Sequence, residues 1–162
     1  AQSVKGRVEV VPTPGKDYTV LIDYSHTPDS LENILKAVRG FCTGRIIAVF
    51  GCGGDRDPFK RPVMGKIAAE LSDLAIVTSD NPRTEDPYKI LRQILAGMQD
   101  TETPYEVIES RVSAIGRAME LAQKDDVIVL CGKGHETYQE IGHEKHHLDE
   151  REVVASYLEA NA

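Results

Sequence analysis

Charged and amide side chains follow several apolar runs of the sequence, and their types suit the binding of a small charged molecule. Arg56 and Arg83 can each hold a carboxylate through two parallel hydrogen bonds. Asp80 and Glu136 can hold an ammonium group, and Asn81 can both donate and accept a hydrogen bond. These residues together predict a site for a zwitterionic ligand with more than one carboxylate, such as an amino acid.

The same residues also allow a purely structural interpretation. Asp80 and Asn81 could cap a turn before Pro82, because short polar side chains readily accept hydrogen bonds from nearby backbone. The two arginines could pair with Asp55 and Asp57 at the surface. The residues alone leave the binding and the structural interpretations open.

The elements that must position these side chains alternate between strand and helix. Near-continuous apolar runs indicate strands that are covered on both faces, as in parallel sheets. The predicted strands lie at residues 7–11, 18–23, 45–50, 74–78, 105–108 and 126–131, the first of them an edge strand. Apolar residues spaced three or four apart predict helices over residues 31–38, 64–71, 90–98, 112–119 and 149–158. The fold class is therefore α/β: a Rossmann-like, mostly parallel sheet of about six strands with helices on both faces.

Polar or glycine-rich segments follow five of these strands. They are residues 23–28, 51–57, 79–83, 109–111 and 132–136. Ligands of open parallel sheets bind outside the carboxyl ends of the strands, so we expect all five segments to line one rim. Gly132 and Gly134 in the last segment allow close approach of backbone to a ligand. A short hairpin with a turn near Gly142 is expected at residues 138–148.

The glycine-rich segments do not fit two common nucleotide-binding motifs. Gly51 to Arg56 resembles a dinucleotide fingerprint, but Arg56 stands where the third glycine is needed for close helix packing. A nucleotide-binding oxidoreductase domain is therefore disfavoured. The sequence contains no Walker A loop, so it shows no recognisable loop of its own to hold a triphosphate.

Histidines offer two further possibilities for chemistry. His135 could be a general base or a residue that orients and packs beside the glycines. A second group resembles a set of metal ligands but falls in the predicted polar hairpin, which favours a solvated face over a metal site; it comprises His143, Glu144, His146 and His147.

Composition excludes several classes of protein. The 162 residues are about one domain in length, and the net charge of −7 argues against binding nucleic acid or an anionic membrane. The apolar runs are far shorter than the roughly 20 residues of a membrane helix. Cys42, Cys52 and Cys131 are an odd number without a CxxC pair, which predicts free thiols and a cytoplasmic protein.

Five ordered motifs resemble one family. GRVEVV, DYSHTPDSL, FGCGGDRDPFKRPVMG, TSDNPRTEDP and GKGHE, in this order, are similar to the C-terminal, third domain of the Mur ligases, and most similar to the members that add meso-diaminopimelate to UDP-N-acetylmuramoyl-L-alanyl-D-glutamate. The resemblance implies that residues 1–162 are a single domain without the family's N-terminal and central ATP-binding domains. It implies that the protein is cytoplasmic and monomeric and that its binding partners are small-molecule substrates. It also implies that the whole ligase uses ATP and Mg²⁺, whereas this domain alone binds no cofactor and is inactive.

The resemblance also assigns roles to single residues. Arg7 and Asp23 correspond to residues that contact ATP when the domains close, and no catalytic residue or metal ligand is expected in this domain. The pocket for meso-diaminopimelate corresponds to Arg56, Asp80, Asn81, Arg83, Gly132 and Glu136. An arginine facing the second carboxylate of diaminopimelate would exclude lysine, which lacks that group. The alternatives are a lysine-adding member of the family and a non-catalytic amino-acid-binding module.

Overall fold

The computed structural model describes residues 8–162, and Arg7 lies outside these described residues. Six strands form one sheet in the order β1-β2-β6-β3-β4-β5. They span Val8–Val11 (β1), Thr19–Asp23 (β2), Ile46–Phe50 (β3), Leu74–Val77 (β4), Tyr105–Val107 (β5) and Val127–Cys131 (β6). Each predicted strand is present to within two residues of its expected ends.

The sheet is parallel except at one edge. β2, β6, β3, β4 and β5 pair in parallel, and β1 pairs antiparallel with β2. All five residues of β3 and of β6 are buried, because both strands lie inside the sheet and are covered on both faces. The mostly parallel α/β class is therefore confirmed.

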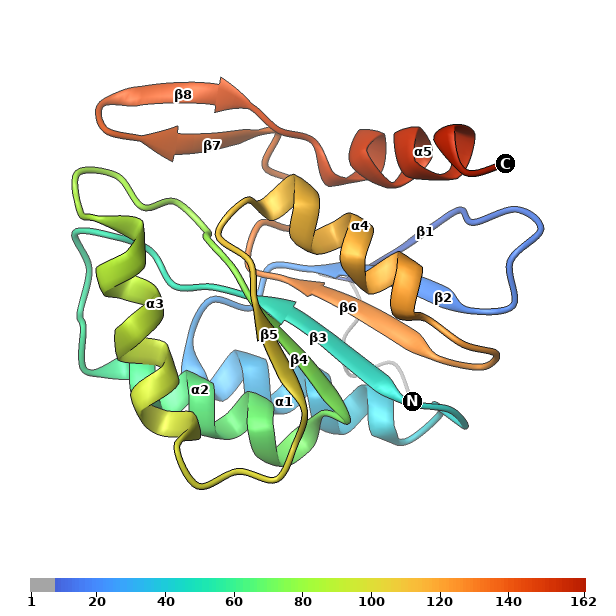
Figure 1. The fold of residues 1–162 in the computed structure, drawn as a ribbon, viewed down its shortest axis with the longest axis horizontal. Helices are drawn as coiled ribbons and strands as arrows, with labels where there is room; N and C mark the ends of the chain where they lie inside the picture. The colour runs from blue at the N-terminus through green and yellow to red at the C-terminus, as the bar shows by residue number, and fades with distance from the viewer. Residues whose placement is uncertain (1–7) are drawn as a thin grey trace.

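Helices cover both faces of the sheet, as Figure 1 shows. They span Pro28–Arg39 (α1), Lys60–Leu71 (α2), Pro87–Leu95 (α3), Arg111–Leu121 (α4) and Glu150–Ala160 (α5). A short 3₁₀ turn, Ala96–Met98, extends α3. α1, α2 and α3 pack on the face to which Ala48 and Phe50 point, whereas α4 and α5 pack on the face of Ile47 and Val49. Alternating β3 residues thus belong to two separate hydrophobic cores, as the period of two along a strand requires.

Short polar side chains start the helices. Thr27 caps α1 in a reciprocal pair with Ser30, and Pro28 is the first helical residue. Asp149 caps α5 through the backbone N–H of Arg151. Asp149 and Glu152 also have the spacing of a capping box, but the carboxylate of Glu152 lies 2.7 Å from His147 instead.

The predicted hairpin is present, and it is bonded to a loop at the carboxyl ends of the strands. It consists of β7 (Tyr138–Ile141) and β8 (Glu144–His147), and Gly142 in its turn has a φ of +63°. The backbone N–H of Arg83 donates to Glu140 O, and the carbonyl of Arg83 accepts from the N–H of Gly142. The hairpin is therefore hydrogen-bonded to the loop that follows β4.

No helix within residues 8–162 is long and apolar enough to cross a membrane.

Candidate functional site

A pocket of about 300 Å³ opens where β2, β3, β4 and β6 end. Its wall is formed by Tyr24, His26, Thr27, Gly53, Arg56, Lys60, Asp80, Asn81, Arg83, Gly132 and Glu136. All six residues predicted to bind an amino acid therefore lie in one wall. Three separate chain segments, after β3, β4 and β6, supply these six residues, because the parallel strands bring their carboxyl ends to the same edge.

One side of the pocket is acidic. The carboxylates of Asp80 and Glu136 each have an oxygen 3.4 Å from Nζ of Lys133, whose side chain is fully buried. Gly132 borders this side with a φ of +117°, and a Cβ there would lie 3.5 Å from Oδ2 of Asp80. This backbone conformation favours glycine and brings the strand end close to the carboxylate.

The other side of the pocket is basic. Nη1 of Arg83 donates to the carbonyl of Gly54 at 3.0 Å, and Nε lies 3.6 Å from the carboxylate of Glu140. A Cβ on Gly53 would lie 2.8 Å from Nη1 of Arg83 and 3.6 Å from Cγ of Arg56. Both arginines therefore gather around the bare backbone of Gly53, while the acidic groups gather beside β6.

Two glycines let the loop after β3 lie directly against the loop after β4. A Cβ at Gly51 would stand 2.1 Å from the carbonyl oxygen of Thr78, and one at Gly54 only 1.8 Å from that of Pro82. No side chain fits at such distances. The glycine-rich sequence thus serves close loop packing beside the pocket, rather than a dinucleotide fingerprint.

A buried arginine ties the same two loops together. Arg61 is fully buried, and its guanidinium donates to both carboxylate oxygens of Glu85 and to the carbonyl of Gly53. These hydrogen bonds from Arg61 lower the pKa of Glu85 to about 2. Glu85 also accepts from the backbone N–H of Asp55, so the ionised carboxylate joins the loops at neutral pH.

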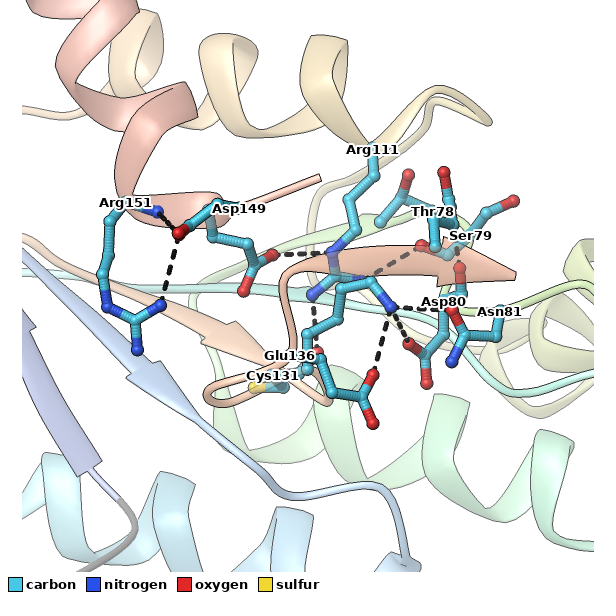
Figure 2. Close-up of polar contacts among 12 residues, drawn as sticks. Thr78, Ser79, Asp80, Asn81, Arg111, Cys131, Glu136, Asp149 and Arg151 are labelled. Carbon is cyan, nitrogen blue, oxygen red and sulfur yellow. Dashed lines mark hydrogen bonds and ion pairs between the residues drawn. The ribbon is translucent and has the colours of Figure 1, made fainter. Parts of the chain in front are cut away.

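The fourth strand-end segment does not line the pocket, contrary to the expectation from topology. Its arginine, Arg111, is turned inward and buried, and Nε lies 2.7 Å from the carboxylate of Glu150. Nη1 and Nη2 donate to the carbonyls of Ser79 and Cys131. Figure 2 shows Arg111 reaching these strand ends from α4. Ser79 and Cys131 directly precede the pocket residues Asp80 and Gly132. The hydrogen bonds from Arg111 therefore fix the backbone from which these two pocket residues extend.

The residue predicted to contact a nucleotide lies apart from the pocket wall. Asp23 ends β2 and is nearly buried, and its carboxylate accepts from the backbone N–H of Ser25 at 2.9 Å. Its counterpart in the prediction, Arg7, is outside the described residues. A nucleotide contact at Asp23 remains a prediction.

His135 is not one of the residues that line the pocket. Its side chain is 72% exposed, Nδ1 accepts from Arg151 at 2.8 Å, and the same atom lies 3.5 Å from Glu9. This position gives it no part in proton transfer within the pocket. The hairpin histidines are exposed, and residues 8–162 contain no group of three or more His, Cys, Asp or Glu side chains that could hold a metal ion.

The cysteines are free thiols. Burial raises the pKa of Cys52 and of Cys131 to about 12, so both stay protonated at neutral pH and behave as small core residues.

The purely structural pairing of the arginines is wrong. Asp55 accepts from the side chain and backbone of Thr84, and Asp57 accepts from the backbone of Phe59. Arg56 is exposed and donates to the carbonyl of Asp55 rather than to a carboxylate. The guanidinium of Arg56 therefore has donors left for a ligand.

Sequence reasoning placed Lys133 and Tyr24 in segments of the rim but gave neither of them a role. Lys133 is fully buried behind the pocket wall and contacts Asp80, Asn81 and Glu136; its place between Gly132 and Gly134 in a strand-end segment is the signal that could have singled it out. Tyr24 also lines the pocket; burial raises its pKa, with a smaller contribution from Glu136. A Cβ at Gly134 would lie 2.9 Å from Tyr24, so this glycine makes room for the ring.

Comparison with known proteins agrees with this geometry. The model of the family described as Mur ligase, glutamate ligase domain, matches residues 6–134. The chain belongs to this family. The resemblance predicted from the five ordered motifs is thereby confirmed.

Relatives and a solved structure point to the same branch. UDP-N-acetylmuramoyl-L-alanyl-D-glutamate–2,6-diaminopimelate ligase of Clostridioides difficile (strain 630) is 54% identical over 98% of this chain, which covers 32% of that protein. The ligase of the same name from Trichormus variabilis is 63% identical over 96% of this chain and 31% of that protein. A solved structure with this name has a TM-score of 0.91 at 40% identity, over 96% of this chain and 32% of that one. The chain spans about a third of the length of the curated relatives it matches.

Proposed function

We propose that this chain is the amino-acid-binding domain of a cytoplasmic, ATP-dependent ligase that joins meso-diaminopimelate to UDP-N-acetylmuramoyl-L-alanyl-D-glutamate in peptidoglycan synthesis. The observation that carries the proposal is the two-sided pocket, in which the six predicted residues meet with carboxylates on one side and guanidiniums on the other. The names of the relatives support it.

The charges of the pocket match those of meso-diaminopimelate. This molecule carries two ammonium and two carboxylate groups at neutral pH. Asp80 and Glu136 would take an ammonium group, and Arg56 would take a carboxylate. Arg83 would take the second carboxylate, the group that lysine lacks. A lysine in this pocket would leave the Arg83 guanidinium without its partner, which is costly in a partly buried site.

Nucleotide and metal would be held mainly by other domains. The sequence has no Walker A loop, and the described residues lack a cluster of metal-ligating side chains. Arg7 and Asp23 would contact ATP when the domains close. ATP bound by those domains would activate the substrate carboxyl group, and Mg²⁺ would balance the phosphate charge. The role of this chain, as a single monomeric domain, would be to bind the incoming amino acid and to orient its amine.

Calorimetric titration tests this proposal. The chain should bind meso-diaminopimelate and should bind L-lysine at least about tenfold more weakly, since one charged contact is lost. Tighter binding of L-lysine would instead favour a lysine-adding member, and equal binding of both would refute the discrimination by Arg83. Failure to bind either would refute the amino-acid-binding role.

A ligation assay tests the division of labour. With ATP, Mg²⁺, the UDP-linked dipeptide and diaminopimelate, the chain alone should form no tripeptide product. Product above background would show that no other domain is required.

A further inference from the structure

Beneath the acidic side of the pocket lies a lysine that the proposed function has not used. Lys133 follows Gly132 at the end of β6, and its side chain is fully buried. A buried ammonium is very unfavourable unless nearby groups compensate its charge. Figure 2 shows Asp80, Asn81 and Glu136 gathered in this region, and each of the three has a side-chain oxygen within hydrogen-bonding range of Nζ of Lys133.

The distances around the ammonium are unequal. Its one short contact, 2.8 Å, is to the neutral Oδ1 of Asn81, whereas the carboxylate oxygens of Asp80 and Glu136 both lie 3.4 Å away. The ring of Tyr138 lies 5.9 Å from Nζ. Lys133 is therefore anchored to an amide and shares its charge between two carboxylates without a short bond to either. Both carboxylates keep acceptor capacity for an ammonium group that enters the pocket.

The same contact orients Asn81. Its Oδ1 accepts from Nζ of Lys133 and from the backbone N–H of Glu140 at 2.9 Å. Since both neighbours of this atom are donors, it must be the amide oxygen. The amide nitrogen is then left as a donor for a ligand carboxylate or carbonyl.

We propose that Lys133 is a positioning residue for the amino-acid site, holding Asp80 and Glu136 together so that both carboxylates face one ligand ammonium. The proposal rests on the proposed function and deepens it. Without the buried cation, the two carboxylates would repel each other, and the partly exposed Glu136 would turn toward solvent. Lys133 shares no contact with Arg56 among the described residues, so the basic side should not depend on it.

A double-mutant cycle tests the proposal through the affinity for meso-diaminopimelate, measured by calorimetry on the chain. Lys133→Met keeps a flexible apolar side chain of similar length and should weaken binding by about 10- to 100-fold. In the Asp80→Asn background one carboxylate charge is already gone. There, Lys133→Met should weaken the affinity for diaminopimelate by less than about fivefold, so that the two substitutions are strongly coupled. In the Arg56→Ala background, Lys133→Met should weaken the affinity by the same factor as in the parent chain, so that these two substitutions are additive. Lys124→Met, at an exposed lysine before β6, is the matched control and should bind like the parent chain.

The outcomes separate positioning from general support of the structure. If Lys133→Met is equally coupled to Asp80→Asn and to Arg56→Ala, or to neither, the proposal is wrong. If Lys133→Met does not fold, the charge-balanced pair Asp80→Asn/Lys133→Met is compared with Asp80→Asn alone, and a loss above about tenfold overturns the proposal. A parent chain that binds no diaminopimelate refutes the proposed function and this inference with it. A parent chain that binds but shows no coupling refutes only the role of Lys133.

Discussion

Replacing Arg83 by alanine should change which amino acid the pocket accepts. In the free chain the guanidinium makes one hydrogen bond to a neutral acceptor, the carbonyl of Gly54, and its ion pair with Glu140 is long at 3.6 Å. The Arg83 side chain is 18% exposed, so a carboxylate can reach it. The loss of the internal contacts should cost about 1 kcal/mol of unfolding free energy.

The loss of ligand binding should be larger. A charge-assisted contact to a carboxylate contributes about 1.5 to 3 kcal/mol net, which corresponds to about 10- to 150-fold in affinity. Calorimetric titration of Arg83→Ala should show this loss for meso-diaminopimelate. Affinity for L-lysine should change by less than about threefold, because lysine has no second carboxylate to contact Arg83 and only the internal contacts of Arg83 with Gly54 and Glu140 are lost.

Backbone strain does not confound this comparison. Arg83 has a φ of +51°, a conformation that is unfavourable for every residue with a Cβ. Arg83→Ala and Arg83→Lys keep this cost, whereas Arg83→Gly would remove it. Lysine retains the charge without the planar fork, so we expect partial recovery of diaminopimelate binding.

An arginine outside the pocket provides the control. Arg92 is exposed on α3, and Arg92→Ala should bind both amino acids like the parent chain. Equal losses for diaminopimelate and lysine in Arg83→Ala would refute the specificity role and leave Arg83 as a residue that only supports the loop.

Two further predictions concern the loops around the pocket. Glu85→Gln should lower the unfolding free energy at pH 7 by about 1.5 to 3 kcal/mol, because hydrogen bonds to the charged carboxylate are lost. Since the pKa of Glu85 is lowered from 4.5 to about 2, this contribution is complete above pH 4.5 and disappears as the pH falls through about 2. Urea unfolding of the parent chain and of Glu85→Gln should show the difference in their unfolding free energies shrinking over that range. A difference that stays constant would contradict the ion pair with Arg61. Gly54→Ala should lower the unfolding free energy by about 3 kcal/mol or more, because its Cβ would meet the carbonyl of Pro82, and should weaken diaminopimelate binding by moving Arg83. Gly142→Ala, where nothing lies within 4 Å and only the φ of +63° opposes a side chain, should cost about 1 to 2 kcal/mol and leave binding unchanged; similar effects of the two substitutions would refute the packing role of Gly54.

The sequence by itself determined the order of the elements and the rim at which the site lies. Continuous apolar runs such as Val127–Cys131 require cover on both faces, and helical periods between them supply that cover. A polar residue at the end of such a strand can lie only at the sheet edge. Asp80, Asn81 and Glu136 could therefore be placed at one rim from local pattern alone.

Only the tertiary structure decided which strand ends meet and which charged groups turn inward. β6, near the end of the chain, inserts between β2 and β3, and this pairing brings Lys133 under Asp80 across 53 residues of sequence. Arg111 and Arg83 both follow strands in the sequence, yet Arg111 is buried beneath the strand ends while Arg83 lines the pocket. The period of a pattern reports which face an element buries. It does not indicate which partner a buried charge pairs with, because that partner comes from a distant segment and is determined by strand order and loop packing.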